Sequence, residues 1–90
     1  MDWSSRPKQR ADYRLEALDG ELLLYHPAQT KVLYCNETAS LIWKLCDGQH
    51  TANEIVVLLA EAFPEAMNTI RGDTEAALQR LQEHGAVEFT

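Results

Sequence analysis

Cysteine and histidine are the side chains of this sequence that could act as nucleophiles, general bases or metal ligands. The chain contains five of them: His26, Cys35, Cys46, His50 and His84. Cys46 and His50 form the closest Cys/His pair, but an Asp-Gly pair that is expected to end a helix lies between them. Zinc sites show tighter ligand pairs than this. The pattern therefore predicts a protein that is not an enzyme and that holds no metal or other cofactor, with buried cysteines and with histidines on the surface or in loops.

Charge and composition exclude further classes of protein. The 90 residues carry a net charge of −6, which disfavours binding to the phosphates of nucleic acid. No apolar run approaches the roughly 20 residues needed to cross a bilayer, and no N-terminal stretch combines basic, apolar and small-residue cleavage regions as a secretory signal does. Two cysteines without CxxC spacing favour reduced thiols. These features predict a cytoplasmic protein with no nucleic-acid or membrane partner.

Three short strands are expected to form an antiparallel meander. Residues 13–18 alternate in polarity, and Asp19 with Gly20 supplies a dipeptide that is favoured in two-residue hairpin turns. Residues 21–26 and 31–35 are the second and third strands, separated by a loop that contains a proline.

Three helices follow. Asn36 is suited to cap the first one, and Thr51 with Glu54 has the capping-box pattern that opens the second. Pro64 interrupts the second helix, and Gly85 is placed to end the third. The expected core residues of the helices recur at helical spacing: Ala39, Ile42, Trp43, Cys46, Ile55, Leu58, Leu59, Ala62, Ile70, Thr74, Ala77, Leu78 and Leu81.

The first twelve residues differ from the rest. They hold Arg6, Lys8 and Arg10 and have no apolar period that could anchor them in a core. We expect residues 1–12 to be a flexible basic arm, with Trp3 either disordered or docked on a partner, and residues 13–90 to be the folded domain.

This order of elements predicts an α+β fold of the winged helix-turn-helix type, with a three-stranded antiparallel β-sheet followed by three α-helices (βββααα). DNA binding is the obvious function of such a shape. However, the last helix sets Arg71 and Arg80 against Asp73, Glu75 and Glu83, so it lacks the excess positive charge that positions a helix on phosphates.

Two segments, "DGELLLYHPAQTKVLYCNETASLIWKLCDGQHTANEIVVLLAEAF" and "DTEAALQRLQEHGAV", carry a resemblance to a known family. Together they resemble the PqqD-like peptide chaperones, also called RiPP recognition elements. The residues that match the family pattern are Asn36, Ala39, Ile42, Trp43, Asp47, Gly48, Ile55, Leu59, Asp73, Leu78, Leu81 and Gly85. The resemblance covers about residues 13 to 89.

The family implies a function for the third strand. The leader segment of a ribosomally synthesised precursor peptide would add to its exposed edge as a further strand. The third helix would then flank the groove, with Ala77 admitting a leader side chain and Arg80 pairing with an acidic leader residue. The peptide-binding residues expected on this basis are Lys31, Val32, Leu33, Tyr34, Asp73, Ala77, Arg80 and His84.

By the same resemblance, the chain is a non-catalytic subunit that presents a precursor peptide to a separate modifying enzyme, such as a radical S-adenosylmethionine maturase or a leader peptidase. The alternative function is a small winged-helix regulator that binds DNA or a protein, and a plain oligomerisation module is a third. An exposed edge strand is also compatible with a homodimer.

Overall fold

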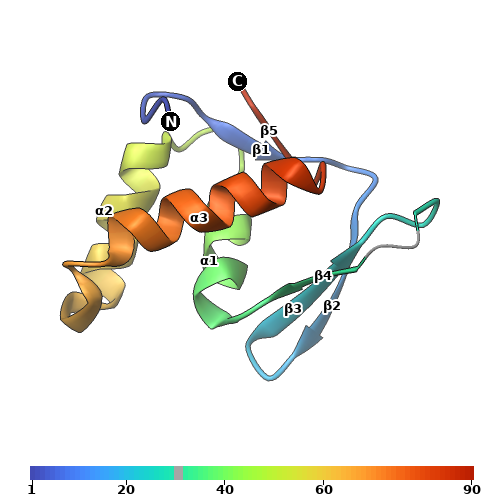
Figure 1. The fold of residues 1–90 in the computed structure, drawn as a ribbon, viewed down its shortest axis with the longest axis horizontal. Coiled ribbons are helices and arrows are strands. Elements are labelled where there is room, and N and C mark those ends of the chain that lie inside the picture. Colours follow the sequence, from blue (N-terminus) through green and yellow to red (C-terminus); the bar gives the residue numbers. More distant parts are fainter. Residues whose placement is uncertain (30–31) are drawn as a thin grey trace.

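The computed structural model describes residues 1–29 and 32–90 and contains the three predicted strands. They are β2 (Arg14–Leu18), β3 (Glu21–Tyr25) and β4 (Val32–Cys35), which form an antiparallel sheet in the order β2-β3-β4 (Figure 1). Asp19 and Gly20 connect β2 to β3 with φ angles of 49° and 85°. Two positive φ angles are the signature of the type I′ turn that the dipeptide predicts. The meander is confirmed, and both β2 and β4 are edges of its sheet.

The three predicted helices are confirmed as well. They are α1 (Glu37–Leu45), α2 (Ala52–Ala62) and α3 (Ile70–Glu83), and a short 3₁₀ turn, η1 (Pro64–Ala66), joins the last two. The Asn36 side chain accepts a hydrogen bond from the amide of Ala39, as an N-cap should. Both hydrogen bonds of the capping box between Thr51 and Glu54 are present at the start of α2.

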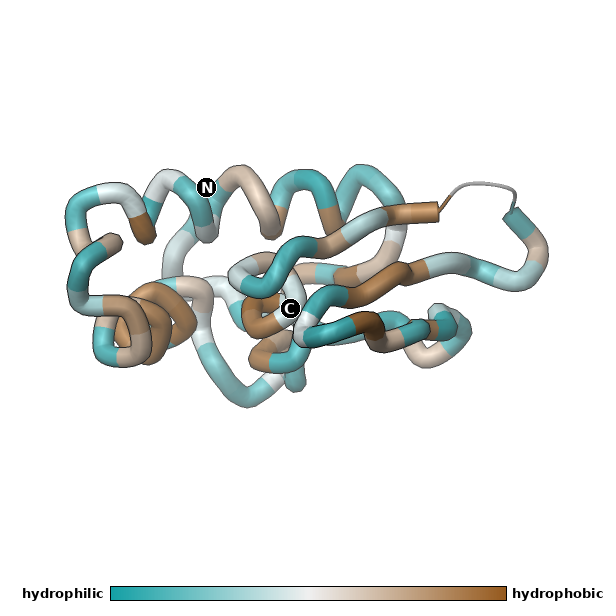
Figure 2. The backbone as a smooth tube through the Cα atoms, turned by 90° about the horizontal axis from the view of Figure 1, so that it is seen from below, coloured by the Kyte–Doolittle hydropathy of each residue, from teal (hydrophilic) through white to brown (hydrophobic). Residues whose placement is uncertain are grey.

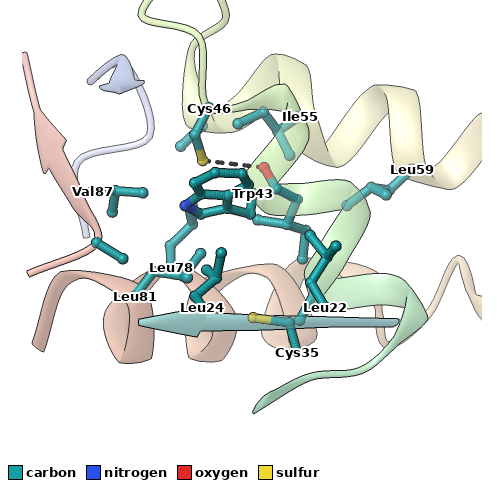
Figure 3. Close-up of a cluster of buried hydrophobic side chains, with 14 of the residues drawn as sticks. Leu22, Leu24, Cys35, Trp43, Cys46, Ile55, Leu59, Leu78, Leu81 and Val87 are labelled. Atoms are coloured by element: carbon teal, nitrogen blue, oxygen red, sulfur yellow. Dashed lines mark hydrogen bonds between the residues drawn. The ribbon is translucent and has the colours of Figure 1, made fainter. Parts of the chain in front are cut away.

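Trp43 of α1 lies at the centre of the hydrophobic core and is 5% exposed (Figure 3). Its indole N–H has no hydrogen-bond partner among the described residues, so the burial of this ring has a polar cost. Labelled side chains from β3, β4, the helical part of the chain and its C-terminal end surround it in the view: Leu22, Leu24, Cys35, Cys46, Ile55, Leu59, Leu78, Leu81 and Val87. One core therefore joins every layer of the fold.

The two cysteines are buried and free, as the sequence predicts. Burial raises the pKa of the Cys46 thiol to about 12, with a smaller contribution from the carboxylate of Asp47. Burial also raises the pKa of Cys35. Neither thiol is therefore ionised near neutral pH, which removes the main source of cysteine reactivity.

The face that α2 buries differs from the predicted one. Ile55 and Leu59 are buried as expected, but Val56 is buried too, whereas Leu58 is 37% exposed and Ala62 is exposed. The helix is apolar on most of its surface, as its long brown stretches in Figure 2 show, so the sequence pattern does not define its inward face.

Residues 1–12 are not the unattached arm that the sequence predicts. Pro7–Gln9 form strand β1, which pairs antiparallel with β5 (Val87–Phe89) in a second, two-stranded sheet. Pro7 is buried, and Gln9 donates a side-chain hydrogen bond of 2.8 Å to the carbonyl of Trp43. Figure 1 places this small sheet at the opposite end of α1 from β2, β3 and β4. The structure thus assigns the segment a strand and contacts with the core.

The first residues of the segment also hold the beginnings of two helices together. The carbonyls of Ser5 and Trp3 accept hydrogen bonds from the amides of Ala52 and Asn53 at the N-terminus of α2. Trp3 packs against the core, and the guanidinium of Arg71 lies 4.5 Å from its ring centroid. Trp3, predicted to be either disordered or docked on a partner, thus lies against the core of its own chain.

We predict that deletion of residues 1–9 lowers the free energy of unfolding by about 2–4 kcal/mol. The deletion exposes the buried side of Val87 and leaves two amides of α2 without their acceptors. Urea unfolding followed by far-UV circular dichroism measures the change. The matched control replaces Arg6, Lys8 and Arg10 with glutamine, which keeps the strand and should alter the free energy by less than about 0.5 kcal/mol. A deletion as stable as this control would show that the segment is an appendage.

Candidate functional site

The free edge of β4 is the centre of the candidate site. Along this strand Leu33 and Cys35 are buried, whereas Val32 and Tyr34 are 57% and 50% exposed. Successive side chains of a strand point to opposite faces, so the two buried residues face the core and the two exposed ones face away from it. Lys31, which the sequence predicts to belong to this edge, lies outside the described residues.

The turn between β2 and β3 determines which backbone groups of β4 are free. A two-residue turn is flanked by a hydrogen-bonded pair, here Leu18 and Glu21, and such pairs then alternate with unbonded ones along the hairpin. On this alternation, Leu22 and Leu24 direct their N–H and C=O groups to β4, where the register pairs them with Cys35 and Leu33. The peptide groups that remain open at the edge are therefore those of Val32 and Tyr34.

Helix α3 supplies a cation to this open edge. The guanidinium of Arg80 donates a hydrogen bond of 3.4 Å to the carbonyl of Tyr34, which is one of the free acceptors. The distance is at the long limit for such a bond, and the contact is exposed, so it is weak. A strand added to β4 would donate a backbone N–H to this same carbonyl of Tyr34. Arg80 thus occupies the place of that donor.

A hollow of about 270 Å³ lies between α3 and the start of α1. Asp73, Ala77 and Arg80 line it from α3, together with Ala76. The other wall consists of residues that the sequence does not predict for the site: Asn36, Thr38, Ala39 and Ile42. The signal for them is their position, because α1 begins directly after β4 and its first turn must lie at the end of that strand.

The structure does not bring His84 into this hollow. His84 is the last of the residues predicted for the site and forms the C-terminal cap of α3. Its carbonyl accepts a hydrogen bond from the hydroxyl of Tyr13. Of the predicted residues that the structure describes, Tyr34 and Arg80 are in contact, Asp73 and Ala77 lie with Arg80 around the hollow, and Val32 and Leu33 lie on the strand.

Other features of the surface offer less to a ligand. A larger hollow of about 590 Å³ lies between the N-terminal residues, α3 and β5, away from the open edge. In the part of the chain that the structure describes, no three His, Cys, Asp or Glu side chains are grouped so that they could hold a metal ion. Across the same residues, no helix has the length and apolar character needed to cross a membrane.

Both arginines of α3 are engaged within the chain. Arg71 donates a hydrogen bond of 2.9 Å to the side chain of Asn53 and stacks on Trp3, and Arg80 contacts Tyr34. Asp73 and Glu75 share the helix with them. This distribution of charge does not suit a helix that binds the phosphates of DNA.

Comparison with solved structures finds the same fold in TbiB1, solved in complex with the TbiA(beta) leader peptide. The TM-score is 0.75 and the match covers 90% of this chain and 94% of that one. The two sequences are 21% identical, so this likeness concerns the fold.

Comparison with curated proteins finds the PqqA binding protein of Klebsiella pneumoniae, both of strain 342 and of the species without a stated strain. Each is 38% identical over 60 residues, which are 63% of this chain. The match spans 62% of the length of these relatives.

A family model described as coenzyme PQQ synthesis protein D (PqqD) matches residues 21–87. The matched region contains β3, β4, all three helices and the start of β5, and so includes the open edge and the hollow beside it. The chain belongs to the PqqD family.

Proposed function

We propose that this chain binds the leader region of a ribosomally synthesised precursor peptide by strand addition to β4, and that it presents the peptide to a separate modifying enzyme. The observation that carries the proposal is the open edge of β4 with Arg80 of α3 beside it. The names of the relatives support it, because one of them is a PqqA binding protein and a structural neighbour was solved with a leader peptide.

Backbone and side chains contribute differently to this mode of binding. The open N–H and C=O groups of Val32 and Tyr34 hydrogen-bond to any extended peptide, so they provide affinity without regard to sequence. Selectivity must come from side chains. A peptide residue opposite Leu33 points to the inner side of the sheet, toward the helices, and the hollow beside Ala77 and Arg80 adjoins the C-terminal end of β4.

Arg80 is suited to an exchange of partners. When a peptide N–H binds the carbonyl of Tyr34, it replaces the weak contact of 3.4 Å that the guanidinium makes there. The released guanidinium then faces the bound strand and can pair with a carboxylate of the peptide. The exchange favours leaders that carry an acidic residue near the point of pairing.

The role in this proposal is non-catalytic. The residues around the hollow include an aspartate and an arginine but no nucleophile paired with a base, and the buried thiols are not ionised near neutral pH. Chemistry on the precursor is therefore assigned to a partner, such as a radical S-adenosylmethionine maturase or a leader peptidase. The two free, buried cysteines agree with a cytoplasmic location.

A binding selection tests the proposal directly. The full chain is immobilised and used to select from phage-displayed random peptides of about 15 residues, together with short peptides encoded beside its gene, and a DNA duplex serves as the control ligand. We expect peptide binders that compete with one another for one site and no binding of the duplex. Failure to recover any peptide, or binding of the duplex alone, contradicts the proposal.

Proline substitutions at neighbouring positions of β4 should separate binding from folding. Val32→Pro removes an N–H from the open edge, where proline is tolerated, and we expect the selected peptides to bind about threefold to tenfold more weakly. The matched control is Val32→Ile, which keeps both the N–H and an apolar side chain at the same position. Leu33→Pro should instead lower the free energy of unfolding by about 3 kcal/mol, because its N–H bonds to β3. Fluorescence anisotropy and urea unfolding measure the two effects. Equal peptide affinity of the two Val32 variants contradicts strand addition at this edge.

Reversal of the charge at Arg80 tests the exchange of partners. We expect Arg80→Glu to weaken binding of acidic leader peptides by about tenfold, since a charge-assisted hydrogen bond is replaced by repulsion. Gln79→Glu, on the adjacent and differently oriented position of α3, is the control and should change affinity less than twofold. An affinity of Arg80→Glu within twofold of the unmodified chain would refute the charge pair.

A further inference from the structure

The outer face of the three-stranded sheet has a regular composition. Register places its residues in two rows across the strands, one of Arg14, Tyr25 and Val32 and one of Glu16, Leu23 and Tyr34. None of these side chains is buried. The core lies on the other side of the sheet, against Leu22, Leu24, Leu33 and Cys35.

Polarity changes across this face from one edge to the other. At the β2 edge both rows end in charged side chains, Arg14 and Glu16. At the β4 edge they end in Val32 and Tyr34, which are 57% and 50% exposed. Charged residues on an edge strand discourage pairing with another strand, whereas apolar ones leave it open. Among the described residues of these rows, charged side chains therefore protect the β2 edge and not the β4 edge, which is the one beside Arg80.

Tyr34 also has a carboxylate near it on this face. The side chain of Glu21, on β3, is the main cause that raises the pKa of the Tyr34 phenol, and partial desolvation adds to it.

We infer that the peptide bound at β4 carries two apolar or aromatic side chains, two residues apart, that pack on Val32 and Tyr34 on the outer face of the sheet. This inference rests on the proposed function and specifies the peptide more closely. Residues that pair across strands share a face, so the peptide residues opposite Val32 and Tyr34 must point outward. The residue between them points to the inner side of the sheet, where the helices lie and where Arg80 of α3 reaches β4.

The recognised segment therefore has a defined pattern. Its outward positions are apolar, because they pack on the exposed side chains of Val32 and Tyr34, which have Leu23 and Tyr25 behind them. Its inward positions meet Asp73, Ala77 and Arg80 and accept a small or an acidic side chain. A charged residue at an outward position would lose part of its hydration when it packs on Val32 and Tyr34. Leader segments with charged residues there are therefore disfavoured.

The experiment uses the phage-displayed random peptides selected on the full chain. Affinity is measured by anisotropy for Val32→Thr, Tyr34→Thr and the double variant, since threonine keeps the strand propensity and removes the apolar contact. We expect the double variant to bind about threefold to tenfold more weakly. The control is Arg14→Thr with Glu16→Thr, which makes the same change at the β2 edge of the same rows and should alter affinity less than twofold.

A double-mutant cycle between protein and peptide identifies which peptide residue contacts Val32 and which contacts Tyr34. Apolar residues of the peptide are replaced one at a time with threonine, and each peptide is measured on the unmodified chain, on Val32→Thr and on Tyr34→Thr. We expect one position to lose its effect in the Tyr34→Thr background and the position two residues away to lose its effect with Val32→Thr. Tyr34→Phe, which keeps the ring, should bind as the unmodified chain does. Circular dichroism verifies that every variant is folded.

Three results would overturn the inference, and they differ in what else they affect. Peptides that bind the unmodified chain and the double variant within twofold refute the outer contact while the proposed function stands. If the double variant changes self-association in sedimentation but leaves the peptide affinity unchanged, the outer face pairs copies of the chain. Recovery of no binding peptide at all removes the proposed function and this inference together.

Discussion

The alternation of buried and exposed residues along β4 is the constraint on which the rest of the site depends. Leu33 and Cys35 must face the core, and this fixes the outward direction of Val32 and Tyr34. The turn at Asp19 and Gly20 determines, through the hairpin ladder, which peptide groups remain unpaired. A slip of one residue would reverse the faces and also redirect the free N–H and C=O groups. Side-chain packing and backbone hydrogen bonding therefore specify one edge together.

The helices turn that edge into a site. Trp43 packs α1 against both sheets, while α3 presents Leu78 and Leu81 to the core. With its inward face fixed in this way, α3 places Ala77 and Arg80 on the side that flanks β4. The edge thus receives a small side chain and a cation from one helix, and its hollow is completed by the first turn of α1. These are the residues between which the proposed function places an extended peptide.

Local signals explain why most of the fold could be predicted from the sequence. The type I′ dipeptide, the Asn36 cap and the capping box each act within a few residues, and all three are present in the structure. The pairing of β1 with β5 was missed because it joins opposite ends of the chain. In the sequence, strand β1 is indicated only by the alternation of Arg6, Lys8 and Arg10 with uncharged residues. Of these uncharged residues, Pro7 is buried. The α1 wall of the hollow was missed for a similar reason, since it depends on where packing places that helix.

Amide hydrogen exchange of β4 with and without a bound peptide measures the central claim most directly. In the free chain the amides of Leu33 and Cys35 should be protected by their bonds to β3, whereas those of Val32 and Tyr34 should exchange rapidly. A leader peptide that adds as a strand should slow exchange at Val32 and Tyr34 and change Leu33 and Cys35 much less. Peptide binding that leaves Val32 and Tyr34 in rapid exchange would contradict the account, because the peptide would then be held somewhere other than the open edge.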